Sequence, residues 1–456
     1  MKRLAVSFFL IATLSGCATN SLFVSYPSQL NKQRQALTTT QPLSSIQSVS
    51  DNTSGNDGLL YALEAGRIAQ VAGEFGQSEK FYQQAVKDYQ VFDEKATISL
   101  SSVGANASSL LLNDNAIPYR GPGYERVLLH QYQALNYLFQ NDYQGALVEV
   151  RRANELQQTE QDKYAKSKKS ARLLENGAVS EEERRLSANA GSVTSSYLNA
   201  YSFFMTGLLH EMLNQPNDAF IDYRKAAQIW PGNPYLEQSL VRLAKQLSMP
   251  QYAEFKKRWG DAKSPKKNQG ELIIVYEKGF VQEKQSFTIP FRINGSWQTA
   301  SLATYNRPAA NLSPVTVNIN STEVIQASPI TNIDALAINA LKEELPYALA
   351  RQAARIAVKA ELARKSTSKH KRKNDELDIG SIAAQIFNVI TEQADRRSWL
   401  TLPNQAQIAR VNLNSGSYPL SIDNSTSHSI NVEAGRKTLV WAIKTGNVTR
   451  FYSIII

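Results

Sequence analysis

Few residues of this chain have a type and spacing that could perform catalysis. The 456 residues include four histidines, and none of them is spaced as in a zinc-binding HExxH motif. The single cysteine excludes an internal disulfide and any cysteine-based zinc or iron–sulfur site. The sequence contains no GxGxxG, P-loop or GxSxG motif. We therefore expect no metal, no cofactor and no enzymatic activity, and a hydrolase is the least favoured hypothesis.

The densest group of charged and aromatic residues lies in the last quarter of the chain, and its members are Asp395, Arg396, Arg397 and Trp399. An Asp–Arg pair beside an indole could bind a carboxylate or a sugar. The same residues could instead cap a helix and fix the strand that follows, and we favour this structural interpretation. His130 and His210 lie among aromatic residues, and we interpret them as packed side chains rather than catalytic bases.

The N-terminus is organised like a secretion signal. Lys2 and Arg3 precede the apolar run Leu4–Thr13, which is too short to span a bilayer. The run leads into a motif that resembles the lipobox of bacterial lipoproteins, made of Leu14, Ser15, Gly16 and Cys17. This resemblance implies cleavage before Cys17, a diacylglyceride on its sulfur and an acyl chain on the new amino terminus. The alternative is an ordinary secretory signal with an incidental cysteine.

A lipidated Cys17 would hold the protein on a membrane. Each buried CH₂ contributes about 0.8 kcal/mol, and anchoring by more than one acyl chain is stable. Ala18 follows the cysteine, and by resemblance to enterobacterial sorting a residue other than Asp there favours the outer membrane. No later segment has 18 uninterrupted apolar residues, so we expect the remainder to be soluble and to face the periplasm. That compartment and a net charge of only +10 argue against nucleic acid as a partner.

Composition and hydrophobic spacing predict a multidomain α+β protein. Its 42% apolar residues suffice for packed cores, and the length suggests two or three domains. We expect an N-terminal all-α, irregular tetratricopeptide-like solenoid and a C-terminal antiparallel β domain with an α-hairpin insertion, or else two small β units flanking the helices. The expected segments are a signal peptide (1–16), a lipidated N-terminus and flexible linker (17–57), the helical domain (58–260), the first part of the β domain (268–332), the helical insertion (333–397) and the second part of the β domain (398–456). Within the linker, a short helix around residues 29–37 is an alternative.

A pattern of small and aromatic residues recurs within the helical region, and its clearest copy consists of Gly207, Ala219, Tyr223, Ala226 and Pro231. These offsets match the tetratricopeptide repeat, in which small residues lie where two helices cross, an aromatic ring fills the gap and proline ends the second helix. Weaker copies start at Gly66 and Ala134. Such an array is expected to bind a protein in its groove, and an unrelated helical bundle is the alternative.

Three passages together resemble a little-characterised family of proteobacterial tetratricopeptide-repeat outer-membrane lipoproteins. They are Tyr119–Glu125 with the following His130–Leu138, then Ala146–Ala153, and Asp395–Pro403. Members of that family are often encoded near outer-membrane lipoproteins that activate penicillin-binding proteins. The resemblance implies an envelope scaffold with a link to peptidoglycan synthesis, and it implies no catalytic residues.

The favoured functional interpretation is a non-enzymatic adaptor. Cys17 would anchor it to the outer membrane, facing the periplasm, and the helical repeats would bind an envelope protein. The alternative is a peptidoglycan- or polysaccharide-binding component of wall assembly or export. In that case Trp297, Trp399 or Trp441 would serve as stacking surfaces for sugar rings.

Overall fold

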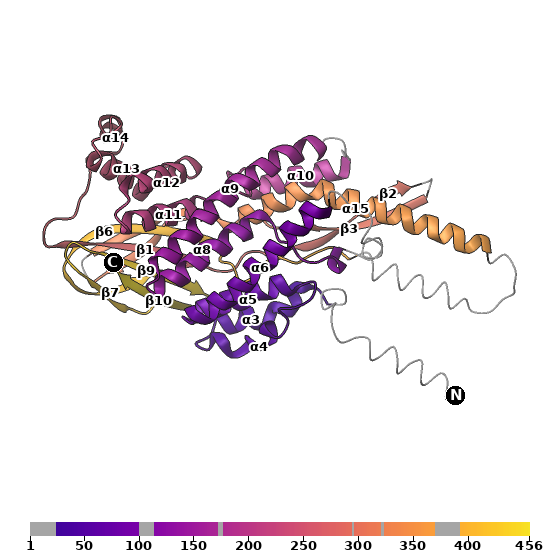
Figure 1. Cartoon of the computed structure of the whole chain (residues 1–456), viewed down its shortest axis with the longest axis horizontal. Helices are drawn as coiled ribbons and strands as arrows, with labels where there is room; N and C mark the ends of the chain where they lie inside the picture. Colours follow the sequence, from indigo (N-terminus) through magenta and orange to yellow (C-terminus); the bar gives the residue numbers. More distant parts are fainter. Residues whose placement is uncertain (1–23, 100–113, 172–176, 294–295, 321–322, 370–392) are drawn as a thin grey trace.

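The computed structural model describes residues 24–99, 114–171, 177–293, 296–320, 323–369 and 393–456. It has mixed α+β architecture, with helical hairpins laid against one side of a curled sheet (Figure 1). The lipobox residues and Cys17 lie outside the described residues, as does most of the second helix expected in the insertion.

Helices occupy most of the chain up to residue 259 and one long segment of the C-terminal half. Their bounds are α3 (Tyr26–Leu37), η1 (Pro42–Ser45), α4 (Gln47–Ser50), α5 (Gly58–Val71), α6 (Phe75–Ser99), η2 (Asp114–Ala116), α8 (Gly123–Phe139), α9 (Tyr143–Ala171), α10 (Gly177–Ala190), α11 (Ala200–Met212), α12 (Pro216–Ile229), α13 (Pro234–Gln246), α14 (Tyr252–Trp259) and α15 (Ile333–Lys369).

Eight strands form one sheet in the order β10-β9-β1-β6-β5-β4-β7-β8, and β2 pairs with β3 as a separate hairpin beside α15 (Figure 1). The strand bounds are β1 (Gln269–Lys278), β2 (Gln285–Ile293), β3 (Ser296–Thr304), β4 (Val315–Ile319), β5 (Glu323–Asn332), β6 (Gln405–Asn414), β7 (Gly416–Ile422), β8 (His428–Val432), β9 (Lys437–Thr445) and β10 (Val448–Ile455). Strands from before and after α15 alternate within this sheet, so they form one unit and not two.

The central strands are buried on both faces because the sheet curls over itself. Strand β8 contacts β1, β9 and β10, although it lies at the far end of the strand order. On β1, Ile273 and Val275 pack in the core shared with the helices, whereas Leu272, Ile274 and Tyr276 pack in a second core inside the curl. Period-two alternation thus separates two cores rather than a core and a solvated face.

The helical hairpins repeat the same turn. In the loops after α5, α8, α11 and α13, one residue takes a positive φ, and these residues are Gly73, Asn141, Asn214 and Ser248. The next backbone N–H donates to the carbonyl five residues earlier in all four loops, at 2.7 to 2.9 Å. This is the Schellman ending, which satisfies the last helical carbonyls and reverses the chain. One local device therefore builds every hairpin of the array.

The predicted repeat positions meet where the two helices of a hairpin cross. A methyl group added at Gly207 would come within 2.8 Å of the Tyr223 ring, and one at Gly66 would overlap the Tyr82 ring in the same way. Ala219 and Ala226 are fully buried, and Pro231 follows the end of α12. In the middle hairpin, Ala134 takes the place of the glycine and Val150 takes the place of the tyrosine. The residue on the first helix is thus larger, and the residue that packs on it is smaller.

The expectation of a flexible linker up to residue 57 is wrong for residues 24–57. Pro27 opens α3, and Tyr26, Leu30 and Leu37 are buried against the first hairpin. The polar composition of this segment concealed a narrow apolar stripe at helical spacing.

The expectation of an all-antiparallel sheet is also wrong, because β1 and β9 pair in parallel. These strands are about 160 residues apart in the sequence, so no short turn constrains their direction. Among the described helices, none is long and apolar enough to cross a membrane.

Replacing Gly207 with alanine should destabilise the third hairpin, because the new methyl group would overlap the fully buried Tyr223 ring. We expect Gly207→Ala to lower the free energy of unfolding by about 1–3 kcal/mol in urea titrations. Gly76→Ala is the matched control, since a methyl group there meets only the end of the Gln140 side chain. Alanine exceeds glycine in helix propensity, so the control should be neutral or stabilised. Equal effects of the two substitutions would contradict this packing role.

Candidate interaction surface

A buried carboxylate on the sheet connects it to the first helices of the repeats. Glu277 of β1 forms an ion pair with Arg67 of α5 and accepts a hydrogen bond of 2.8 Å from the hydroxyl of Tyr201 of α11. The Arg67 guanidinium lies 4.4 Å from the ring centroid of Tyr132 and 5.4 Å from that of Trp441. Burial alone would lower the pKa of Arg67, but Glu277 holds that pKa above its usual value.

A second buried carboxylate, Glu211 of α11, makes the corresponding connection further along the array. Its side chain pairs with Arg410 of β6 at 3.1 Å and with Arg242 of α13 at 2.7 Å, and it accepts from the Tyr223 hydroxyl at 3.0 Å. Burial by itself would raise the pKa of Glu211, but Arg410, Arg242 and the nearby Lys437 hold it well below its usual value. This face of the helices is therefore covered by the sheet.

In the cluster predicted from residues 395–399, Arg397 and Trp399 lie in the interior, and Asp395 and Arg396 are half-buried. Arg397 is 3% exposed and donates to its neighbour Asp395, to Asp57 and to the backbone oxygens of Asp114 and Ile117. Because its guanidinium makes all these contacts within the chain, Arg397 stabilises the fold and is not available to bind a ligand. Burial acts to raise the pKa of Asp395, but Arg397 outweighs it and lowers that pKa to about 2.

Arg396 and Trp399 complete this arrangement. The Arg396 side chain donates a hydrogen bond of 2.6 Å to the backbone carbonyl of Lys284. Trp399 is fully buried, with its ring edge-on to Tyr82 and Tyr132 at centroid distances of 5.8 and 5.9 Å. The cluster therefore fixes the segment between the insertion and β6.

Two glutamates of the helical array hold the backbone of the segment 399–401, which precedes β6. The N–H of Trp399 donates to Glu125 at 2.9 Å, and those of Leu400 and Thr401 donate to Glu64 at 2.7 and 3.1 Å. Three consecutive N–H groups are thus bound by buried carboxylates of α5 and α8. The helices hold a segment of their own chain in the way a repeat array would hold a peptide.

Two sequence-based expectations fail here. Trp399 and Trp441 are fully buried, so neither can stack on a sugar, and the Trp297 side chain lies outside the described residues. The helical face expected to bind a partner is filled by the chain's own sheet and by residues 395–401. Strand alternation could have indicated the second failure, since Glu277 falls on the same face as Ile273 and Val275.

An open groove remains on the outer side of the array, between α9 and α12. It encloses about 270 Å³, and it is lined by Arg151, Asn154, Glu155, His210, Asp218, Ile221 and Asp222. Ile221 is 42% exposed at the groove, and Val148, one turn before Arg151 on α9, is 46% exposed. Exposed apolar side chains that form a patch rimmed by polar residues mark interaction sites, whereas single ones are common on protein surfaces.

The floor of this groove is polar and internally paired. His210 lies 2.7 Å from the Gln215 amide oxygen and 3.7 Å from Asp222, and Asn154 donates to Asp222 at 3.3 Å. Burial raises the pKa of Asp222 to about 6, although the interaction with His210 acts to lower it. No set of three possible metal ligands gathers anywhere in the described ranges. The groove thus offers an apolar lip over a fixed polar base.

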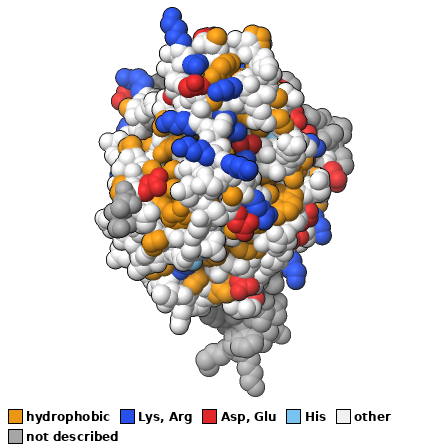
Figure 2. All heavy atoms as spheres, turned by 90° about the vertical axis from the view of Figure 1, so that its left-hand side faces the viewer, with side chains coloured by type: hydrophobic (Ala, Val, Ile, Leu, Met, Phe, Trp, Pro, Cys, Tyr) orange, Lys and Arg blue, Asp and Glu red, His pale blue; other side chains and the backbone are white. Residues whose placement is uncertain are grey.

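Much of the positive charge lies at the end of the array. Residues 245–267 contain seven lysines and arginines against two acidic residues. Figure 2 looks onto this end of the molecule and shows Lys and Arg side chains gathered in its upper half. Lys256 and Lys245 pair with Asp261, and the other cations of the segment are exposed. The charge is thus local rather than spread evenly over the surface.

Comparisons with known proteins give little further information. No family model matches the chain, and no curated protein matches it. Among solved structures the chain is similar to the crystal structure of MamA protein, with 12% identity over 54% of this chain and 99% of that chain and a TM-score of 0.29. A match this loose does not establish a shared fold. The resemblance to tetratricopeptide lipoproteins stays a prediction from the sequence.

The environment of Glu64 makes stability depend on pH. Burial raises the pKa of Glu64 to about 7, although the hydrogen bonds from Thr401 and Leu400 oppose this shift. The folded protein therefore binds the Glu64 proton more tightly than the unfolded chain does. Its contribution to stability is complete below the unfolded pKa of about 4.5 and is lost as pH rises through about 7.

We predict that Glu64→Gln flattens part of the decline in unfolding free energy between about pH 5 and pH 7. The effect should be about 3 kcal/mol, at 1.36 kcal/mol for each pKa unit. Denaturant titrations across this range measure it, and Glu94→Gln, at an exposed glutamate of α6, should leave the slope unchanged. Because burial also raises the pKa of Asp222 and of Asp334 to about 6, some slope should remain. Identical slopes in Glu64→Gln and the natural protein would contradict the prediction.

Proposed function

We propose that this chain is a non-enzymatic scaffold that binds a protein partner of the cell envelope in the groove between α9 and α12. The observation that carries the proposal is the exposure of Ile221 and Val148 beside this groove, on hairpins whose other face is closed. A repeat array presents adjacent hairpins at fixed spacing, which suits it to bind an extended or helical segment. Arg151 and Glu155 on one wall and Asp218 on the other supply charge for specificity.

The absence of an enzymatic role is part of the proposal. Its support is that the buried carboxylates Glu64, Glu125, Glu211 and Glu277 each bind donors of the chain itself. Groups committed to backbone N–H groups and to arginines in this way are poorly placed to act on a substrate.

Anchoring through Cys17 at the periplasmic face of the outer membrane is likewise proposed, on the basis of the lipobox. The first described residue, Val24, comes seven positions later, and seven extended residues span at most about 25 Å. The helices α3 and α4 would therefore lie close to the membrane surface. An anchor this short would keep the groove within the reach of membrane-bound partners.

Substitution of Ile221 with glutamate should abolish partner binding, because it places a charge at the apolar lip of the groove. The measurement is cross-linking in cells from a photoreactive residue at position 148, followed by mass spectrometry of the adduct. We expect one reproducible protein adduct, reduced at least about tenfold by Ile221→Glu. Val324→Glu is the matched control, because Val324 is 55% exposed on β5 outside the groove. If both variants give the natural yield of adduct, the groove is not the partner site.

Cys17→Ala should release the protein from membranes, because the acylated sulfur and amino group would be lost. Fractionation of cells into membrane and soluble extracts measures this, and Ser15→Ala, which keeps a small residue in the lipobox, should stay membrane-bound. Retention of Cys17→Ala in the membrane fraction would overturn the anchoring proposal without affecting the groove.

A further inference from the structure

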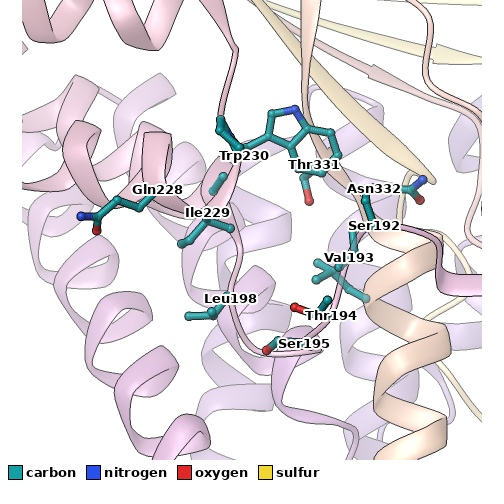
Figure 3. A pocket seen from close by; sticks show the side chains of 13 residues that line it. Ser192, Val193, Thr194, Ser195, Leu198, Gln228, Ile229, Trp230, Thr331 and Asn332 are labelled. Carbon is teal, nitrogen blue, oxygen red and sulfur yellow. The ribbon is translucent and has the colours of Figure 1, made fainter. Parts of the chain in front are cut away.

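A cavity of about 480 Å³ opens where the helical array meets α15 and β5 (Figure 3). Ligand-binding cavities are commonly about 300–1,000 Å³ in volume. Three segments line it: residues 192–198 before α11, the end of α12 with the following Trp230 and Pro231, and the junction of β5 with α15. It shares no lining residue with the α9–α12 groove.

The lining of this cavity combines an indole with hydroxyl groups and carries no charged side chain. Trp230 lies on one side and Thr194 and Ser195 lie on the opposite side, with Thr331 near the indole (Figure 3). Ile229 and Leu198 add apolar surface between them. Hydroxyls both donate and accept hydrogen bonds, whereas the indole face offers apolar contact.

The walls are held in place by hydrogen bonds between lining residues and neighbouring elements. Asn339 of α15 donates to the carbonyl of Val193 at 2.7 Å, which fixes the loop before α11. Asn332 donates to the carbonyl of Ala310 at 2.8 Å and accepts from the N–H of Ala335 at 3.1 Å. A cavity with preformed walls loses little entropy when it binds a ligand.

We propose that this cavity binds an uncharged saccharide, with one sugar ring packed on Trp230 and ring hydroxyls bonded to Thr194, Ser195 and Thr331. A pyranose has an apolar face of C–H groups and a rim of hydroxyls, which matches this lining. A phosphate or carboxylate would lack a cationic partner here. An acyl chain would bury the cavity's hydroxyls without hydrogen bonds, at a cost for each one.

The experiment is isothermal titration of the full-length protein with two uncharged probes, N-acetylated chitotetraose and cellotetraose. At least one should bind, and Trp230→Ala should weaken that binding by at least about tenfold, equivalent to 1.4 kcal/mol. Trp259→Ala is the matched control, because Trp259 of α14 is also half-buried and contacts the Phe255 ring outside the cavity. It should bind the probe as tightly as the natural protein does.

A second variant separates loss of binding from loss of folding. Thr194→Trp places a large ring in the cavity at an exposed position, removes no buried side chain, and should also abolish binding. Failure of both saccharides to bind the natural protein would overturn the proposal. So would undiminished binding by Trp230→Ala and Thr194→Trp. Binding of palmitate instead, blocked by Thr194→Trp, would reject the saccharide in favour of a lipid site.

Discussion

The ion pair between Glu277 and Arg67 is the contact on which the arrangement of the helices over the sheet depends. Both side chains are essentially removed from water, at 0% and 1% exposure. A buried charge without its partner costs several kcal/mol, so α5 cannot shift relative to β1 without breaking the pair. Because Tyr201 donates to the same carboxylate and Tyr132 stacks on the same guanidinium, three hairpins are fixed by one residue of the sheet.

This constraint decides which surfaces remain for binding. A repeat array usually offers one face to partners, but here the sheet and the segment 395–401 occupy the face that carries Glu64, Glu125 and Glu211. Among the described residues, the outer groove at Ile221 and the uncharged cavity at Trp230 are two surfaces that stay open. They use different residues, so a protein and a saccharide could be bound at the same time.

Much of the local structure could be predicted from the sequence. The spacing of Gly207, Ala219, Tyr223 and Ala226 specifies a tight helix crossing, because the tyrosine ring occupies the space that a side chain on the glycine would fill. The strands from β6 to β10 follow from alternation and turn residues. In the folded segment before α5, the sequence indicated at most a short helix around residues 29–37, since its polar residues outweigh the stripe formed by Tyr26, Leu30 and Leu37.

The sequence by itself determined most of the helices, hairpins and strands, because these depend on side chains a few positions apart. Only the tertiary structure decided what the charged and aromatic residues do. Arg397 and Trp399 have the composition of a ligand site, yet their partners Asp57 and Tyr82 come from more than 300 residues away. Whether such a group faces solvent or its own chain is set by long-range packing. The hydrophobic periodicity of the sequence does not predict that packing.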